Sequence, residues 1–158
     1  MEIFDEGRVT LELTLAARMG LAALLGFLVG LERESRGKSA GERTFAIVAL
    51  GAAGISGLAI MMFPETAGQA VAGVAAGIGF LGVGIIWRAE EGQTRGLTTA
   101  ASILGVAAIG AVAGVGLYLT AIVATVLALF ILEFDRMPGL RELHRRVTGR
   151  MDEEGDGT

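Results

Sequence analysis

The chain has 158 residues, of which 53% are hydrophobic and only 19% are charged. This balance excludes an ordinary water-soluble domain, which needs polar residues over its whole surface, and indicates one integral membrane domain. The chain has no cysteine, which excludes disulfides and thiolate metal sites. Its net charge of −4 is unevenly distributed, because the charges fall in a few blocks.

The first predicted span, over about residues 10–31, follows a short extracytoplasmic segment at residues 1–9. Residues 19–31 are uncharged, but this stretch reaches only about 20 Å as a helix, and the bilayer core is ~30 Å thick. A helix that crosses the membrane must therefore begin earlier and carry Arg18 some distance into it. Such a residue is either functional, or it snorkels to the outer face or pairs with Glu12.

Four further spans follow from uncharged windows in the sequence. The windows 44–64 and 66–87 each hold about one bilayer crossing. The window 97–132 would be about 54 Å long as one helix, which is too long for one crossing. Residues 114–116, Gly-Val-Gly, divide it, and Tyr118 suits an interfacial aromatic. We predict an all-α bundle of about five transmembrane helices, over residues 10–31, 44–63, 69–87, 97–113 and 117–134.

Lysine and arginine are distributed unequally between the two predicted faces. Eleven of the thirteen lie in the segments 32–44 and 88–96 and in the tail 135–158, while Arg8 lies on the other face and Arg18 within a span. The positive-inside rule then places the N-terminus outside and the C-terminus in the cytoplasm. The tail is expected to be a basic amphipathic helix on the inner leaflet, or a frayed polar tail, followed by an acidic disordered end.

Glycine accounts for 25 of the 158 residues, and many lie inside the predicted spans. Three pairs spaced four residues apart place small residues on one helix face, which lets helices in lipid approach closely. We expect these faces to pack within the chain, and a homo-oligomer interface is the alternative. The pairs are Gly26 with Gly30, Gly73 with Gly77, and Gly110 with Gly114.

The densest polar segment, residues 32–44, joins the first two spans. Anchoring by the positive-inside rule explains its basic residues but not its three carboxylates. Glu32 is placed to reach Arg43 at the start of the second span, and we expect the two to pair. In the second loop, residues 88–99, Thr98 is expected to cap the next helix and leave its N–H groups facing the first loop.

The two loops are therefore predicted to form a polar cytoplasmic site for a phosphate, an ion or a protein partner. Its candidate residues are Glu32, Arg33, Glu34, Lys38, Gly41, Arg43 and Thr44 in the first loop, with Arg18, Arg95, Thr98, Thr99 and Ser102 as further polar candidates.

The sequence lends little support to catalysis. The one histidine, His144, lies in the tail, and no catalytic triad or metal-ligand cluster is visible, so we expect no enzyme activity, cofactor, bound metal or nucleic-acid partner. Spans two to five contain no carboxylate, the ligand that Mg²⁺ prefers, which argues against a magnesium channel. A transporter or channel for an ion or small solute is the alternative to a regulatory role.

Four linked motifs run in order over roughly residues 13–134. They are Arg18 with Gly26-x-x-x-Gly30-Leu31-Glu32-Arg33-Glu34, Lys38-x-Ala40-Gly41-x-Arg43-Thr44, Gly77-Ile78-Gly79-Phe80-Leu81-Gly82-x-Gly84, and Gly96-Leu97-Thr98-Thr99-Ala100-Ala101, completed by Gly110 and Gly114-x-Gly116-x-Tyr118. On these motifs the chain resembles the MgtC/SapB family of bacterial membrane proteins. Glu42 stands where the family usually has leucine, and Leu104 near an expected tryptophan.

The resemblance implies a multi-pass inner-membrane protein, here expected to comprise the transmembrane domain without the C-terminal soluble domain of some members. Family members are linked to growth under low magnesium and to survival inside host cells. They are described as regulators of membrane machinery, including the F-type ATP synthase. By this resemblance we expect a non-enzymatic regulator linked to magnesium homeostasis, with the lipid bilayer and another membrane protein such as the ATP synthase as partners.

Overall fold

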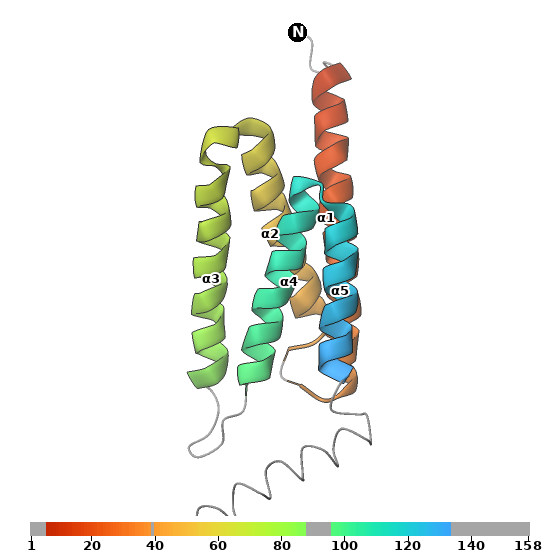
Figure 1. Cartoon of the computed structure of the whole chain (residues 1–158), viewed down its shortest axis with the longest axis vertical. Coiled ribbons are helices and arrows are strands. Elements are labelled where there is room, and N and C mark those ends of the chain that lie inside the picture. Colours follow the sequence, from red (N-terminus) through yellow and green to blue (C-terminus); the bar gives the residue numbers. More distant parts are fainter. Residues whose placement is uncertain (1–5, 39, 88–95, 134–158) are drawn as a thin grey trace, which may run out of the picture.

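The computed structural model describes residues 6–38, 40–87 and 96–133, and within these residues it contains helices and no strand. The predicted all-α bundle is confirmed (Figure 1). Four of its helices are long and apolar enough to cross a membrane, and the last is a shorter apolar helix. In chain order the elements are α1 (Glu6–Ser35), α2 (Glu42–Met62), the 3-10 turn η1 (Pro64–Thr66), α3 (Ala67–Trp87), α4 (Leu97–Val115) and α5 (Tyr118–Glu133).

The longest helix is α1, with 30 residues, or about 45 Å. Its N-terminal part extends past the other helices (Figure 1). The break predicted at residues 114–116 is real, because Gly116 takes a φ of 102° and ends α4. The Leu117 N–H donates to the Val112 carbonyl at 3.0 Å, a bond typical of glycine-terminated helices. α5 then starts at Tyr118 and returns along the bundle.

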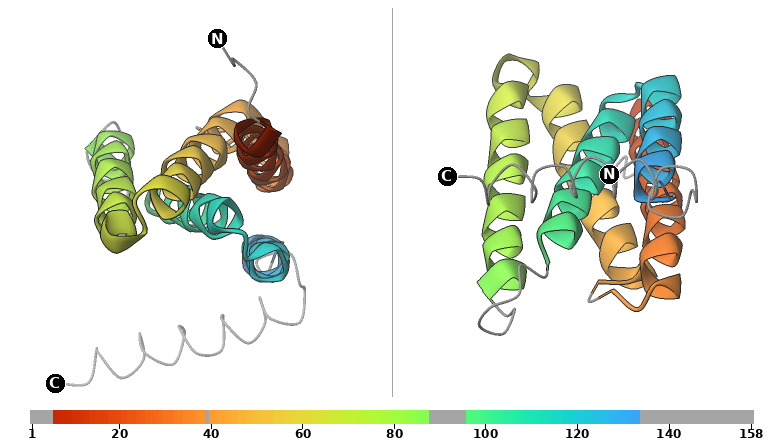
Figure 2. Two further views of the ribbon diagram at one scale, coloured as in Figure 1. Left: turned by 90° about the horizontal axis from the view of Figure 1, so that it is seen from above. Right: turned by 60° about the horizontal axis from the view of Figure 1, so that its bottom comes forward.

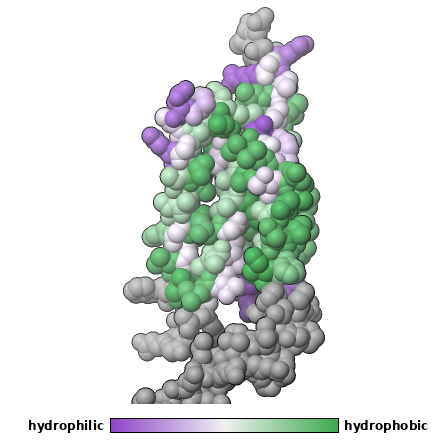
Figure 3. All heavy atoms as spheres, in the orientation of Figure 1, coloured by the Kyte–Doolittle hydropathy of each residue, from purple (hydrophilic) through white to green (hydrophobic). Residues whose placement is uncertain are grey.

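α2 and α4 form the middle of the bundle. Seen from above, they lie beside each other, with α1 and α5 towards one side and α3 at the opposite edge (Figure 2). Apolar side chains cover much of the middle of the face shown in Figure 3, and the hydrophilic ones gather mainly near its upper end. This distribution suits a bundle whose outer surface meets lipid.

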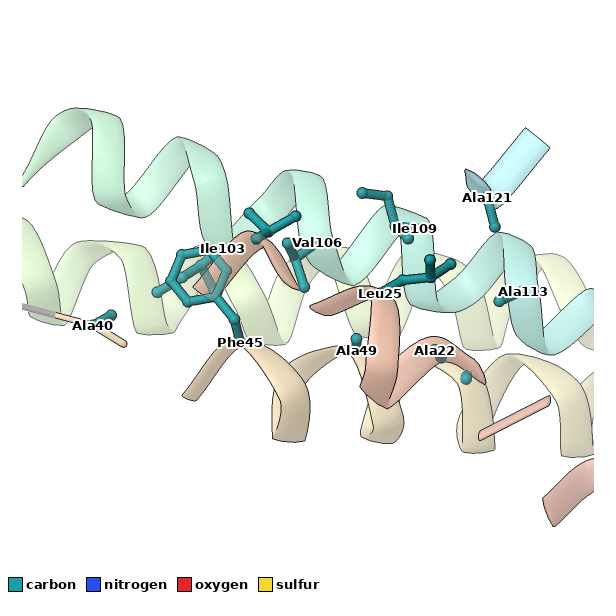
Figure 4. Packing of buried hydrophobic residues seen from close by; sticks show 12 residues of the cluster. Ala22, Leu25, Ala40, Phe45, Ala49, Ile103, Val106, Ile109, Ala113 and Ala121 are labelled. Carbon is teal, nitrogen blue, oxygen red and sulfur yellow. The ribbon is translucent and has the colours of Figure 1, made fainter. Parts of the chain in front are cut away.

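The core lies where α1, α2 and α4 meet. Phe45 of α2 is fully buried and lies beside Ile103 of α4, while Val106 and Leu25 continue the cluster along the helices (Figure 4). Alanines fill most of the remaining positions, so the helix axes come close together. Since lipid is as apolar as these side chains, the packing is stabilised mainly by dispersion between closely spaced surfaces.

Two of the three predicted glycine pairs lie at these close contacts. A Cβ added at Gly26 would lie 2.5 Å from the Phe45 carbonyl oxygen, and one added at Gly110 would collide with the Ala49 carbonyl. Their partners in the motif behave alike, since a Cβ at Gly30 would collide with the start of α2 and one at Gly114 with the backbone of its middle. Close helix packing is confirmed at these two pairs.

The third pair contacts none of the described residues, so the prediction that it packs within the chain was wrong. A Cβ added at Gly73 or Gly77 would meet no atom within 4 Å. α3 contacts the rest of the bundle through its other face, where a Cβ at Gly82 would lie 3.5 Å from Ala100 and Ile78 and Ile85 pack against the core. The four-residue spacing places two glycines on one face but does not decide which face turns towards a neighbour.

Candidate functional site

The polar groups of the first loop gather at one end of the bundle. We call it the Arg33 end, and it comprises the last turn of α1, the loop 36–41, the first turns of α2 and α4, and the last turn of α5. The opposite end, where α4 turns into α5, is the Arg18 end. The second predicted loop contributes its described part, from Gly96 onwards; Arg95 and the tail 134–158 lie outside the described residues.

At the Arg33 end, Arg36 joins the first loop to two helices. It forms an ion pair with Glu32 one turn earlier, and its Nη2 lies 2.6 Å from the Glu133 Oε2 at the end of α5. The Arg36 side chain is 23% exposed and that of Glu32 is 11% exposed, so the pair is partly shielded from water. It stabilises the last turn of α5 against the loop.

The expected pair between Glu32 and Arg43 is not formed. The Arg43 side chain is 92% exposed and its nearest carboxylate is that of the adjacent Glu42, at 3.8 Å. The physical reason is that α1 continues to Ser35, past its predicted end. Arg36 follows directly in the turn after α1, so Glu32 and Arg36 lie four residues apart, a spacing at which side chains meet.

Arg33 is the buried cation of this end, with 3% of its surface exposed. Its Nη2 donates to the Thr99 Oγ1 at 2.9 Å, which joins the end of α1 to the first turn of α4. Its Nε is buried without a hydrogen-bond partner. Within the described part of the chain, no carboxylate lies at ion-pair distance from its guanidinium. The structure thus brings together one residue from each predicted loop.

The start of α4 differs from the expectation. The helix begins at Leu97 after Gly96, which has a φ of 105° and supplies no capping side chain. Thr98 therefore does not cap the helix; it is exposed within the first turn, where its carbonyl accepts a hydrogen bond from the Ser102 Oγ at 2.6 Å. Among the described residues, no side chain accepts a hydrogen bond from the N–H groups of this turn.

A shallow pocket of about 330 Å³ lies between the last turn of α1 and the start of α2. Glu34 accepts a hydrogen bond from the Glu42 N–H at 3.3 Å, and the Glu42 Oε2 is buried without a hydrogen-bond partner. Lys38 is exposed on the neighbouring loop. No group of three residues that could hold a metal ion is found in the described residues. The pocket is lined by Glu34, Gly41, Glu42, Arg43 and Thr44.

Arg18, the other charged candidate, has a local role at the Arg18 end. Its Nη1 donates to the Gly114 carbonyl at 2.9 Å and its Nε donates to the Tyr118 Oη at 3.1 Å. Glu12 instead pairs with Arg8 at 3.4 Å, so the expected alternative of an Arg18–Glu12 pair is not observed. Arg18 therefore places a positive charge at the C-terminal end of α4, where the helix dipole and the unpaired carbonyls favour it.

Three residues of the Arg33 end were not among the candidates: Arg36, Glu42 and Glu133. The spacing of Glu32 and Arg36 was a usable signal, because a helix that continues almost to residue 36 brings two side chains four residues apart together. Nothing local in the sequence indicated Glu133, since its contact with Arg36 depends on how α5 returns to the loop.

Packed apolar helices with polar groups gathered at the ends of the bundle define a multi-pass helical membrane protein. The MgtC family model matches residues 19–139. The chain belongs to the MgtC family.

The relatives confirm this membership. Protein MgtC of Salmonella typhimurium is 44% identical over 108 residues, which cover 68% of this chain and 46% of the relative. Protein MgtC of Brucella abortus is 44% identical over 112 residues, which cover 70% of this chain and 47% of the relative. Protein SrpB of Synechococcus elongatus is 37% identical over an alignment of 157 residues, which covers 85% of this chain and 84% of the relative. The chain thus spans about half the length of the MgtC relatives. No solved structure matches it significantly.

Proposed function

We propose that this chain is a non-enzymatic regulator of membrane machinery in the cell's inner membrane, linked to adaptation to low magnesium. It acts through the Arg33 end, which faces the cytoplasm. The observation that carries the proposal is the pocket lined by Glu34, Glu42, Arg43 and their neighbours, which presents charged groups on a helical frame held by the Arg36 ion pairs.

The polarity of the spans supports a regulator over a cation transporter. Between residues 43 and 133 the one carboxylate outside the segment 88–95 is Glu65, which lies in the turn η1. Arg18 is already used by the end of α4 and by Tyr118. A cation would therefore meet hydroxyls and backbone carbonyls along most of any path, and these groups do not balance its charge.

The partner that the family resemblance suggests is the F-type ATP synthase. Arg43 suits a contact residue because its side chain is 92% exposed and lies at the pocket rim. Replacing it should leave the bundle intact, since a surface substitution typically changes stability by less than about 0.5 kcal/mol. A loss of function in such a variant would then report on contact with the partner.

The test uses inverted membrane vesicles from cells with and without the chain, in which proton pumping driven by ATP hydrolysis is measured. We expect the chain to lower the pumping rate, and Arg43→Gln to restore most of it at equal protein abundance. Arg8→Gln, which removes an exposed charge at the opposite end, is the matched control. Unchanged pumping together with solute flux in proteoliposomes would instead show a transporter.

A further inference from the structure

The first turn of α4 and Arg33 together present hydrogen-bond donors that nothing in the described chain uses. The N–H groups of Leu97, Thr98 and Thr99 precede the first backbone bond of the helix, in which the Ala100 N–H donates to the Gly96 carbonyl. A helix N-terminus carries partial positive charge and attracts anions. The N-cap residue here is Gly96, and no side chain of the described residues caps the turn.

Arg33 supplies a second and independent observation. Its guanidinium is almost completely buried, reaches the same turn through the Thr99 hydroxyl, and keeps its Nε without a partner. A buried cation without an ion-pair partner is destabilising, because it has lost its hydration. Natural proteins relieve this cost with an opposite charge.

Among the described residues, no carboxylate forms an ion pair with Arg33. Glu32 is adjacent in sequence, but it forms its ion pair with Arg36, which also binds Glu133. Glu34 instead accepts a hydrogen bond from the Glu42 N–H at the start of α2. Glu32 and Glu34 therefore stabilise other positions, and the Arg33 Nε remains a donor without an acceptor.

We propose that Arg33 and the first turn of α4 form a binding site for a phosphate-type anion. Arginine is suited to this role because its planar fork of N–H groups matches phosphate oxygens. The anion comes either from free phosphate in the cytoplasm or from the headgroup of an anionic lipid, since the site lies at one end of the bundle, where α1 ends and α4 begins. Binding is a property of the purified chain; its use as a regulatory signal rests on the proposed function.

The test measures binding to the purified full chain in two arms. In the first, thermal stability in a neutral detergent is followed as inorganic phosphate replaces chloride at constant ionic strength. In the second, native mass spectrometry counts the phosphatidylglycerol retained from nanodiscs that otherwise contain phosphatidylcholine. We expect saturable binding in one arm, which identifies the source of the anion. Absence of saturable binding in both arms overturns the site.

Variants decide whether Arg33 carries the binding. Arg33→Gln should weaken it at least about tenfold, as expected for the loss of a buried charged donor. Lys38→Gln, which removes an exposed charge at the same end, should change it less than about twofold, because solvent screens such a charge. Equal losses in both variants, or none in Arg33→Gln, would refute the proposal.

A further variant covers the case in which Arg33→Gln does not fold. Arg33→Lys keeps the charge but lacks the planar fork, so it should bind about tenfold more weakly than the natural chain. Unchanged affinity in Arg33→Lys would overturn the role of the guanidinium. None of these measurements involves the ATP synthase, so they can fail while the proposed function stands, and the reverse also holds.

Discussion

Two arginines carried by the same helix have different roles because their surroundings differ. Arg18 donates to the Gly114 carbonyl and to the Tyr118 Oη, so its hydrogen bonds serve the end of α4 and the start of α5. Arg33 has one hydrogen bond, to Thr99, and a buried Nε without a partner. The first arrangement is satisfied by the chain itself, whereas the second leaves donors for a ligand.

Arg18→Gln should destabilise the chain by about 1–3 kcal/mol, because it removes a charged donor from the end of α4. Tyr118→Phe should cost less, about 0.5–1.5 kcal/mol, since it removes one of the two hydrogen bonds. Thermal unfolding in detergent measures both, with Arg8→Gln as the charge-matched control. If Arg8→Gln costs as much as Arg18→Gln, then Arg18 has no specific role at the helix end.

The helices of this bundle differ in how closely they pack against their neighbours. α2 and α4 approach so closely that glycine is required at their contact, and α1 packs on α2 in the same way. α3 is different, since only 6% of its most apolar window is buried and Phe80 is 83% exposed. The four-residue glycine spacing therefore marks a contact on α1 and α4 and an open face on α3.

Substitutions in the two kinds of glycine pair should separate these cases. Gly110→Leu should destabilise the chain by about 1–3 kcal/mol, because the added side chain would collide with the backbone of α2. Gly77→Leu should be neutral or slightly stabilising in detergent, since it has open space and leucine favours helices more than glycine does. Unfolding midpoints of the two variants give the comparison. A large loss in Gly77→Leu would indicate that α3 contacts a second copy of the chain.

Over the whole molecule, the charged residues that the structure describes lie mainly at the two ends of the bundle. The described basic residues of the first loop lie at the Arg33 end, and Arg8 lies near the other end, on the part of α1 that extends beyond the bundle. The positive-inside rule predicts that the Arg33 end faces the cytoplasm. The pocket and the buried Arg33 then lie on the side where phosphate compounds and the ATP synthase head are found.

Single cysteines test this orientation directly, because the chain has none of its own. Lys38→Cys should be protected from a membrane-impermeant maleimide in intact cells and react in inverted vesicles, while Thr66→Cys should show the opposite pattern. Both positions are exposed. Labelling of both from the same side would contradict a membrane crossing by α2, which lies between the two positions.

The sequence alone determined the class, the five helices and the family resemblance. These depend on hydropathy, on uncharged windows as long as a bilayer, and on the glycines at 114–116, which are local properties of the chain. It also marked most residues of the pocket, because charged groups between two apolar spans must lie at the same membrane boundary.

Only the tertiary structure decided which groups contact each other. Glu32 meets Arg36 rather than Arg43, Arg18 meets the end of α4 rather than Glu12, and the Gly73–Gly77 face meets no other helix. Each outcome depends on the rotation of one helix relative to another and on where α1 ends. These follow from the packing of the small residues of α1, α2 and α4, which involves positions far apart in the sequence.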